Sequence, residues 1–333
     1  MLPTEPVRLE PELRARLDRT PVEGQSLDLL IDLATRHYVQ GNSQIEIARE
    51  LGLDPSTISR YLKRARDEGI VRIDIVTPVR PVLELGLRLA SEFGLDRAIV
   101  TEQTPGGEQQ ELETVARAAA EFISDQLRRG SRVGIGWGQT IAAVARNLAP
   151  GVVGELRVAQ LAGGLADAAP GTQGHELARQ LTEIYPGSRV TYLHAPSIVD
   201  TAEICQVLLA DRSVQAALAT AAQSEIAIVG IGDMTPSATL LAASHVVGPD
   251  LDELLAQGAV GSMNARFFDA DGRPVAHLDR RTVAIEWADL AAIPQVIAIA
   301  AGAAKAPAVR GAIRGGTIDV LITDQATATA ILA

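Results

Sequence analysis

The stretch SQIEIARELGLDPSTISRYLKRARDEGIV, residues 43–71, decides the fold of the N-terminal part of the chain. Ser43 is a preferred residue at the start of a helix, and Glu46 stands where its reciprocal partner in a capping box belongs. Gly52 is suited to end that first helix. The next helix is predicted over residues 54–69, because aspartate and proline open it and glycine closes it. Two short helices joined by a tight glycine-containing turn are typical of a helix-turn-helix.

The surroundings of this motif complete a small domain. Apolar residues recur at helical spacing between Leu29 and Tyr38, which predicts a preceding helix. The run 71–78 is interpreted as a strand that closes the domain, and Pro78 and Pro81 mark a linker. The two helices of the motif are expected to pack through Ile45, Ala48, Leu51, Leu53, Ile58 and Leu62.

The second helix of the motif carries side chains that suit double-stranded DNA. Its first turns offer short donors and the fork of Arg60, which can reach base edges, whereas the later basic residues suit phosphates. Residues 56–66 contain no acid although the chain as a whole is acidic. A three-helix unit with a merely solvated charged face is the alternative. The candidate DNA-binding residues are Ser43, Gln44, Ser56, Thr57, Ser59, Arg60, Lys63, Arg64 and Arg66.

The net charge of −11 is unevenly distributed along the 333 residues. Residues 1–80 hold 12 Lys and Arg against 13 Asp and Glu, a net charge of −1. The remainder holds 18 against 28, a net charge of −10. The acidity therefore belongs to the larger part of the chain and does not argue against DNA binding by the smaller part.

Composition also limits the possible classes of protein. Cys205 is the only cysteine, which excludes an internal disulfide and a thiolate metal cluster. No run of 18 apolar residues could span a membrane. Residues 1–24 are rich in Pro, Glu and Arg without a sustained apolar period, so we expect a mobile tail rather than a signal peptide. We therefore also expect the protein to be cytoplasmic.

From residue 82 onward, helical patterns alternate with short apolar runs. This alternation predicts an α/β fold with a doubly wound parallel sheet and helices on both faces. The runs are residues 97–102, 132–137, 156–164, 189–196, 225–232, 296–302 and 320–324. The domains are thus expected to be a DNA-binding domain over 25–77 and a larger domain over 78–333.

Four of these strands end in loops suited to a small anionic ligand, because ligands of such folds bind at the carboxyl ends of the strands. The loops are residues 134–140, 160–164, 230–233 and 301–305. Glycines permit close backbone approach, and a following helix offers free N–H groups to a phosphate. Lys305, one of only two lysines, suits the same anion. Tight turns whose glycines serve packing alone remain an alternative, and the loops lack a dinucleotide fingerprint.

No catalytic constellation forms in the sequence, and no metal or cofactor is expected. The five histidines are scattered without metal-ligand spacing. An enzyme that isomerises or deaminates sugar phosphates, fused to a DNA-binding domain, is the alternative function. Asp233 and Lys305 are its only obvious acid and base candidates.

In this order and spacing, the motifs resemble those of the SorC family of sugar-binding transcriptional regulators over about residues 26–333. Besides the helix-turn-helix they are GIGWGQT, QLAGG, GIGD, the hairpin RFFDADGRPV at 266–275 and the segment AAGAAKAPAVRGAIRGGTIDVLITDQATA. The resemblance implies a sugar-phosphate-binding domain similar to glucosamine-6-phosphate deaminase and ribose-5-phosphate isomerase. It also implies a homo-oligomer, usually a tetramer, whose affinity for operator DNA changes when a phosphorylated sugar or polyol binds.

The resemblance also assigns effector-binding residues. They are Gly136, Trp137, Gly138, Gln139, Thr140, Gln160, Gly163, Gly164, Asp233, Gly261, Asn264, Phe267 and Lys305. The chain departs from the family at Ser262, where relatives carry an acid, and at Ala265 and Ala303, where they carry glycine. Gln325 stands where an acid is common. These departures make the hydroxyl-binding end less polar, which leaves room for a smaller or less hydroxylated effector.

Overall fold

The computed structural model describes residues 25–71, 82–149, 153–243 and 246–333. The chain divides into two compact units, residues 1–77 and 78–333. The predicted N-terminal tail, all but the first residue of the predicted strand 71–78, and the two linker prolines lie outside the described residues. No helix in the described ranges is both long and apolar enough to cross a bilayer.

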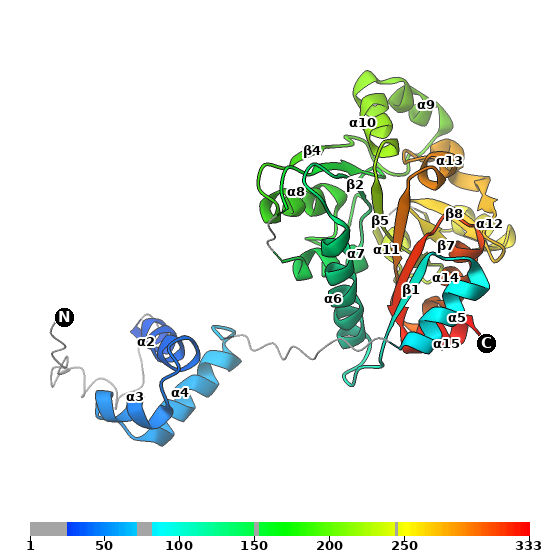
Figure 1. Cartoon of the computed structure of the whole chain (residues 1–333). Coiled ribbons are helices and arrows are strands. Elements are labelled where there is room, and N and C mark those ends of the chain that lie inside the picture. Colours follow the sequence, from blue (N-terminus) through cyan, green and yellow to red (C-terminus); the bar gives the residue numbers. More distant parts are fainter. Residues whose placement is uncertain (1–24, 72–81, 150–152, 244–245) are drawn as a thin grey trace. The chain divides into compact units, whose positions relative to one another are not determined.

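The small unit contains the predicted helix-turn-helix (Figure 1). Its helices are α2 (Gln25–Ala34), which continues into a π-turn (Thr35–Val39), α3 (Gln44–Leu51) and α4 (Pro55–Asp67). The capping box forms as predicted: the Glu46 N–H donates to Ser43 Oγ at 3.2 Å, and the Ser43 N–H donates to the Glu46 carboxylate at 2.8 Å. Gly52 ends α3 with φ of 64°, in the left-handed region that favours glycine.

The core of this unit differs from the prediction at one position. Ile45 was expected inside but is 61% exposed, and Ile47 is buried instead. Ile47 lies one helical turn before Leu51, so these two side chains share the face of α3 that meets α4, whereas Ile45 is two residues out of phase. Fully buried partners of Ile47 include Leu33, Ala48, Ile58 and Leu62.

The larger unit is built on a seven-stranded parallel sheet in the order β1-β11-β10-β5-β2-β3-β4. The strands are β1 (Arg97–Thr101), β2 (Arg132–Ile135), β3 (Arg157–Gln160), β4 (Arg189–Thr191), β5 (Ile226–Gly230), β10 (Gln295–Ile299) and β11 (Val320–Asp324). Each overlaps one of the seven predicted apolar runs. Because parallel strands are buried on both faces, these runs are continuous rather than alternating.

Helices cover both faces of this sheet, which confirms the doubly wound prediction (Figure 1). Side chains such as Ile228 and Ile297 point to one face, and their neighbours Val229 and Val296 point to the other. The first face packs against α6 (Glu108–Gln126), α7 (Gln139–Asn147) and α8 (Gly174–Ile184). The second packs against α5 (Leu83–Phe93), α13 (Trp287–Ala291), α14 (Ala306–Arg314) and α15 (Gln325–Ile331). A helical pair, α9 (Ala202–Ala210) and α10 (Arg212–Ala222), follows β4 and buries Cys205.

A second sheet of four antiparallel strands follows β5. Its strands are β6 (Gly232–Asp233), β7 (Ala259–Met263), β8 (Arg266–Asp269) and β9 (Pro274–Val275), with α11 (Thr239–Ala243) and α12 (Pro249–Ala256) inserted after β6. Only the 266–275 hairpin of this sheet was predicted. Asn264 and Ala265 join β7 to β8 and both have positive φ, as a two-residue type I′ hairpin requires.

The order of strands in the large sheet fixes where a ligand can bind. After β2 the chain proceeds to β3 and β4 on one side, whereas after β5 it proceeds to β10 and β11 on the other. The loops that leave β2 and β5 therefore diverge and open a crevice at the carboxyl ends of these neighbouring strands.

Candidate functional site

The first candidate site is the outward face of α4. Ile58, Leu62 and Ala65 turn inward, which leaves the polar residues of the helix on its opposite face. Of the predicted contacts on α4, Thr57 is half-buried and the others are exposed: Ser56, Ser59, Arg60, Lys63, Arg64 and Arg66. Ser43 and Gln44 lie at the start of α3, where the Ser43 hydroxyl caps the helix.

Most of the cations on this face of α4 make no ion pair within the described small unit. Arg64 pairs with Glu68 one turn later, and Arg60 makes a 3.4 Å contact with the hydroxyl of Thr57. Within residues 25–71, Arg60, Lys63 and Arg66 have no carboxylate close enough for an ion pair. Exposed and unpaired cations of this kind suit a polyanion.

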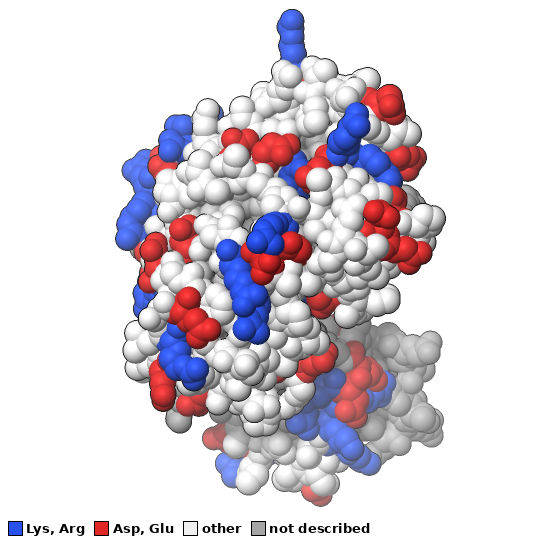
Figure 2. All heavy atoms as spheres, turned by 90° about the vertical axis from the view of Figure 1, so that its right-hand side faces the viewer, with Lys and Arg blue, Asp and Glu red and all other residues white. Residues whose placement is uncertain are grey.

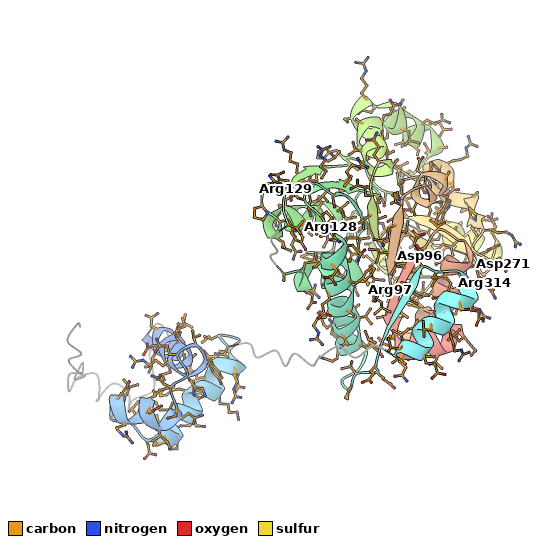
Figure 3. All side chains as sticks on the ribbon, in the orientation of Figure 1. Asp96, Arg97, Arg128, Arg129, Asp271 and Arg314 are labelled. Atoms are coloured by element: carbon orange, nitrogen blue, oxygen red, sulfur yellow. The ribbon has the colours of Figure 1, made fainter. Side chains whose placement is uncertain are left out.

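Arginines of the larger unit have different surroundings (Figure 3). Arg129 pairs with Glu155, and Arg128 donates to the carbonyls of Asp125 and Leu127. Arg97 lies over the ring of Phe122 at 5.4 Å, and Arg314 lies 3.8 Å from Asp271. Figure 2 shows basic and acidic groups interspersed over one face of this unit, with no extended patch of a single sign. This face therefore offers nothing comparable to α4.

The second candidate site is a pocket of about 430 Å³ in the larger unit. It lies at the crevice where the chain leaves β2 and β5, and it extends to the loop after β10. The start of α6, the segment from Thr235 to Leu240 and the β7–β8 turn complete its walls. A pocket of this size accommodates a small metabolite rather than a dinucleotide.

The structure brings seven of the predicted effector-binding residues together in this pocket. They are Trp137, Gly138, Gln139, Thr140, Asp233, Asn264 and Lys305. Trp137 is held in place because its indole N–H donates to the carbonyl of Gly163 at 3.1 Å. Gln139 and Thr140 form the first turn of α7, where unpaired N–H groups and the positive end of the helix dipole favour an anion.

Six predicted residues lie outside the pocket lining. They are Gly136, Gln160, Gly163, Gly164, Gly261 and Phe267. Gln160 is buried, and its carbonyl accepts the Leu193 N–H at 2.8 Å, so its amide joins β3 to the segment after β4. Phe267 is buried in the core beneath the small sheet. These two side chains serve packing, and the prediction that they touch the effector finds no support in their positions.

Three of the four glycines outside the lining, Gly136, Gly163 and Gly261, have neighbours too close for a Cβ. A Cβ on Gly163 would meet the Ala195 carbonyl at 2.5 Å, and one on Gly261 would meet the Cβ of Ala308 at 2.7 Å. Gly136 makes room for the side chain of Asn264, whose Oδ1 would lie 2.9 Å from an added Cβ. Gly136 thus acts on the pocket through a residue that lines it.

Sequence reasoning missed two walls of the pocket. One is Glu108, Gln109 and Leu112 on α6, and the other is the Ser- and Thr-rich segment from Thr235 to Leu240. The first could have been found, because Gly106-Gly107 precedes α6 just after a predicted strand, as in the loops that were singled out. The second follows GIGD directly but has no pattern of its own.

Lys305 is the positively charged residue of the pocket lining, and Glu108 and Asp233 are its acids. Burial lowers the pKa of Lys305 from its ordinary value, and the negative charge of Asp233 partly opposes that shift. A half-buried amine whose charge is only partly compensated by a nearby acid gains from an incoming anion.

A buried carboxylate supports the loop that carries Lys305. Asp324 ends β11, accepts the Gly302 N–H at 2.7 Å, and caps α15 by accepting from Thr327. Thr323 and Asp324 are the last two residues of β11. Both are fully buried and neither lines the pocket, so Asp324 acts on the site by holding the 301–305 loop.

The sequence predicts neither a metal site nor a catalytic constellation. Across the described residues, no group of three or more His, Cys, Asp or Glu side chains could hold a metal ion.

Asp233 Oδ1 accepts from both the N–H and the hydroxyl of Thr235, which fixes this carboxylate at the edge of the pocket.

Two family models match the chain. The model described as "Putative sugar-binding domain" matches residues 77–333, and the model described as "Winged helix-turn-helix DNA-binding" matches residues 40–72. The first covers most of the chain and contains the pocket, whereas the second contains α3 and α4.

Three similar proteins are transcriptional regulators. The deoxyribonucleoside regulator of Bacillus subtilis (strain 168) is 30% identical over 93% of this chain and 99% of its own. The erythritol catabolism regulatory protein EryD of Brucella abortus (strain 2308) is 30% identical over 91% of this chain and 96% of its own. The crystal structure of the full-length sorbitol operon regulator SorC from Klebsiella pneumoniae is 26% identical, covers 93% of this chain and all of its own, and superposes with a TM-score of 0.70.

Proposed function

The chain belongs to the SorC family of sugar-binding transcriptional regulators, and we propose that it controls a carbohydrate or polyol catabolic operon through a phosphorylated effector. The effector-binding and oligomerisation roles are assigned to residues 78–333, and DNA binding to residues 25–77. Because its target is operator DNA, the protein acts in the bacterial cytoplasm.

One observation carries the phosphate part of this proposal. The pocket at the strand crossover combines a desolvated lysine, Lys305, with the open first turn of α7 at Gln139 and Thr140. Both features favour an anion, and neither requires a second charged group on the ligand. A phosphate is the anion that small carbohydrate metabolites most often carry inside cells.

Effector binding and DNA binding are coupled because each ligand binds one conformation of the protein more tightly than the other. A ligand shifts DNA affinity only by the difference in its own affinity for the DNA-competent and DNA-incompetent arrangements. We propose a homotetramer, as the family resemblance implies. A symmetric oligomer reads pseudo-palindromic half-sites, so the operator should contain such sites.

The test is fluorescence anisotropy with the purified full-length protein and DNA from upstream of its own gene, at fixed salt. A panel of sugar and polyol phosphates is added at constant protein concentration. We expect tight binding that one phosphate shifts several-fold, with Lys305→Met still binding DNA but no longer responding. As a matched control, Arg212→Met removes an exposed cation of α10 outside the pocket and should respond as the wild type does.

Two results would contradict the proposal. If an unphosphorylated sugar alters DNA binding and none of the phosphates does, the claim that the effector is phosphorylated is wrong. Binding to upstream DNA no tighter than to unrelated DNA, with and without ligands, would remove the operator assignment and leave sugar-phosphate turnover as the next assay.

A further inference from the structure

The outward face of α4 ends in an acid. Ile58, Leu62 and Ala65 mark the buried side of this helix. The opposite side carries a stripe of exposed residues that follow one another at helical spacing. They are Ser56, Arg60, Lys63 and Asp67. A hydroxyl and two cations therefore precede a carboxylate along one line, and the charge of the stripe changes sign at the C-terminal end of α4.

The surroundings of Asp67 give it no role in the fold of the small unit. It is exposed, and it forms no ion pair or side-chain hydrogen bond with any described residue. Arg64 pairs instead with Glu68, the residue that follows Asp67. Asp67 is also the last residue of α4, where the negative end of the helix dipole disfavours an acid. The described part of the fold therefore does not explain this carboxylate.

The N-terminal end of the stripe has the opposite character. α4 contains no acid in its first turn, and the positive end of its dipole lies there. Asp54 precedes the helix, where the dipole favours an acid, and its carboxylate accepts from the hydroxyl of Ser56 at 3.4 Å. The part of the stripe that suits DNA is therefore the part from Ser56 to Lys63.

The length of the stripe separates two ways in which α4 can meet a duplex. At about 1.5 Å per residue, Asp67 lies about 16 Å along the helix axis from Ser56. The major groove is about 12 Å wide, so an α4 whose N-terminal end reads base edges carries Asp67 beyond the groove. An α4 that lies along the backbone, held by phosphates alone, brings Asp67 among the phosphates that Lys63 and Arg66 contact. The carboxylate opposes the second arrangement more than the first.

We propose that Asp67 is a specificity-determining residue that acts by repulsion. Its carboxylate disfavours sequence-independent contact of α4 with phosphates and so widens the difference in affinity between operator and unrelated DNA. This inference rests on the proposed function and adds a residue outside the predicted DNA contacts. Specific interfaces use such repulsive elements against competing partners. A regulator meets a large excess of unrelated sequences, so this ratio of affinities matters more than the affinity for the operator alone.

The experiment is fluorescence anisotropy with the full-length protein, without effector, on two duplexes of equal length. One is the upstream fragment that the protein binds and the other is an unrelated sequence, each at about 0.1 M and about 0.3 M salt. Asp67→Asn should bind the unrelated duplex about three- to fivefold more tightly, because one negative charge within a Debye length of several phosphates is removed. Operator affinity should change by less than about twofold, and the gain on unrelated DNA should shrink at the higher salt.

Matched variants assign the effect to the position of the charge. Asp67→Ala removes the carboxylate without adding an amide that could contact a base, and it should behave as Asp67→Asn does. Asp28→Asn makes the same change of net charge on the exposed surface of α2 and should keep the wild-type ratio of operator to unrelated binding. Melting temperatures establish that all variants are folded.

The outcomes separate this inference from the function on which it rests. Equal gains on operator and unrelated DNA in both Asp67 variants, or no gain on either duplex, overturn the inference and leave DNA-binding regulation intact. Weaker operator binding in both variants would assign Asp67 to a base contact, such as the amine of cytosine, and overturns it as well. A wild-type protein that binds no upstream fragment more tightly than unrelated DNA contradicts the proposed function, and the inference falls with it.

Discussion

The exposed face of α4 and the interior of the pocket use positive charge in opposite ways. Arg60, Lys63 and Arg66 stand in water without an acidic partner in the described part of the small unit, whereas Lys305 is drawn into a pocket that lowers its pKa. A surface of many solvated cations suits a long polyanion whose counterions are released. A single desolvated amine suits one small anion. Elsewhere, arginines such as Arg129 are paired and belong to neither site.

The two regions also differ in how much core supports them, and the largest expected effect tests this difference. Leu62 is 2% exposed in a small cluster, and Leu62→Ala should cost about 2–5 kcal/mol. That cost is a large part of the stability of a three-helix unit, so DNA binding should be lost. Calorimetry should show the transition of the larger unit unchanged, with phosphate binding retained.

The matched change in the larger unit is Leu181→Ala. The Leu181 side chain is 1% exposed and lies in an extensive hydrophobic core cluster. It should lower the melting temperature of that unit and leave DNA affinity in the absence of effector near its wild-type value. Loss of DNA binding in Leu181→Ala, with Leu62→Ala unaffected, would reverse the comparison.

The next effect in size concerns the half-buried amine of Lys305. Lys305→Met keeps the apolar stem and removes the charge, and it should weaken phosphate binding by about 1.5–3 kcal/mol, the range of hydrogen bonds to charged groups. The same variant should melt no lower than the wild type without ligand, because it removes a half-buried charge that Asp233 only partly compensates. A parallel loss of stability and affinity would instead mean that Lys305 supports the fold.

The pH dependence follows from the lowered pKa of Lys305. In the folded protein the amine loses its proton at a lower pH than in the unfolded chain, where the ordinary value is 10.5. Its burial therefore costs stability while it is protonated, and stability should rise with pH between the two pKa values. Phosphate affinity should fall over the same alkaline range, and should fall earlier than for an exposed lysine. Titrations of the wild type and of Lys305→Met at a series of pH values check this dependence.

On α4, two arginines should separate specificity from general affinity. Arg60→Ala should cost about 1–3 kcal/mol on the operator and much less on unrelated DNA, because a base contact is lost. Arg66→Ala should weaken both about equally and reduce the slope of log affinity against log salt by about one. Equal behaviour of the two variants across operator and unrelated DNA would contradict the assignment of Arg60 to bases.

The smallest effect is expected where charge is paired on the surface. Arg129 and Glu155 form an ion pair whose side chains are 77% and 54% exposed. Exposed pairs contribute about 0–1 kcal/mol, so Arg129→Ala should change stability, DNA affinity and phosphate affinity by amounts near the error of measurement. An effect on DNA binding as large as that of Arg66→Ala would mean that the larger unit also contacts the duplex.

The same comparison explains what could be read from the sequence. Local rules were enough for the small unit: Ser43, Glu46 and Gly52 fix α3, and each acts within four residues of itself. The error at Ile45 arose because two isoleucines two positions apart both satisfy an apolar pattern, and only the partner helix decides which one is buried. In the large sheet, continuous apolar runs identify strands because both faces are covered.

The pocket was predicted less completely because it is assembled from distant segments. Lys305 and Gln139 follow strands and carry their own signals, so the crevice could be anticipated. Gln160 is the last residue of β3, but its amide turns toward Leu193, and no local pattern encodes that direction. Glu108 reaches the pocket only through the packing of α6 on the sheet, and Asn264 only through the short sheet that follows β5.

The carboxylate of Asp324 has one further consequence. It joins the 301–305 loop to the first turn of α15, and α15 packs against α5, the first described helix after the segment that connects the two units. Occupancy at Lys305 is thus separated from the connecting segment by one carboxylate and one helix-to-helix contact. A second link is equally short: β11 lies beside β1, where Asp324 is paired with Thr101, and the neighbouring Val100 carbonyl accepts the Val82 N–H. Substitutions at the α5–α15 contact are therefore expected to change how strongly the effector alters DNA affinity.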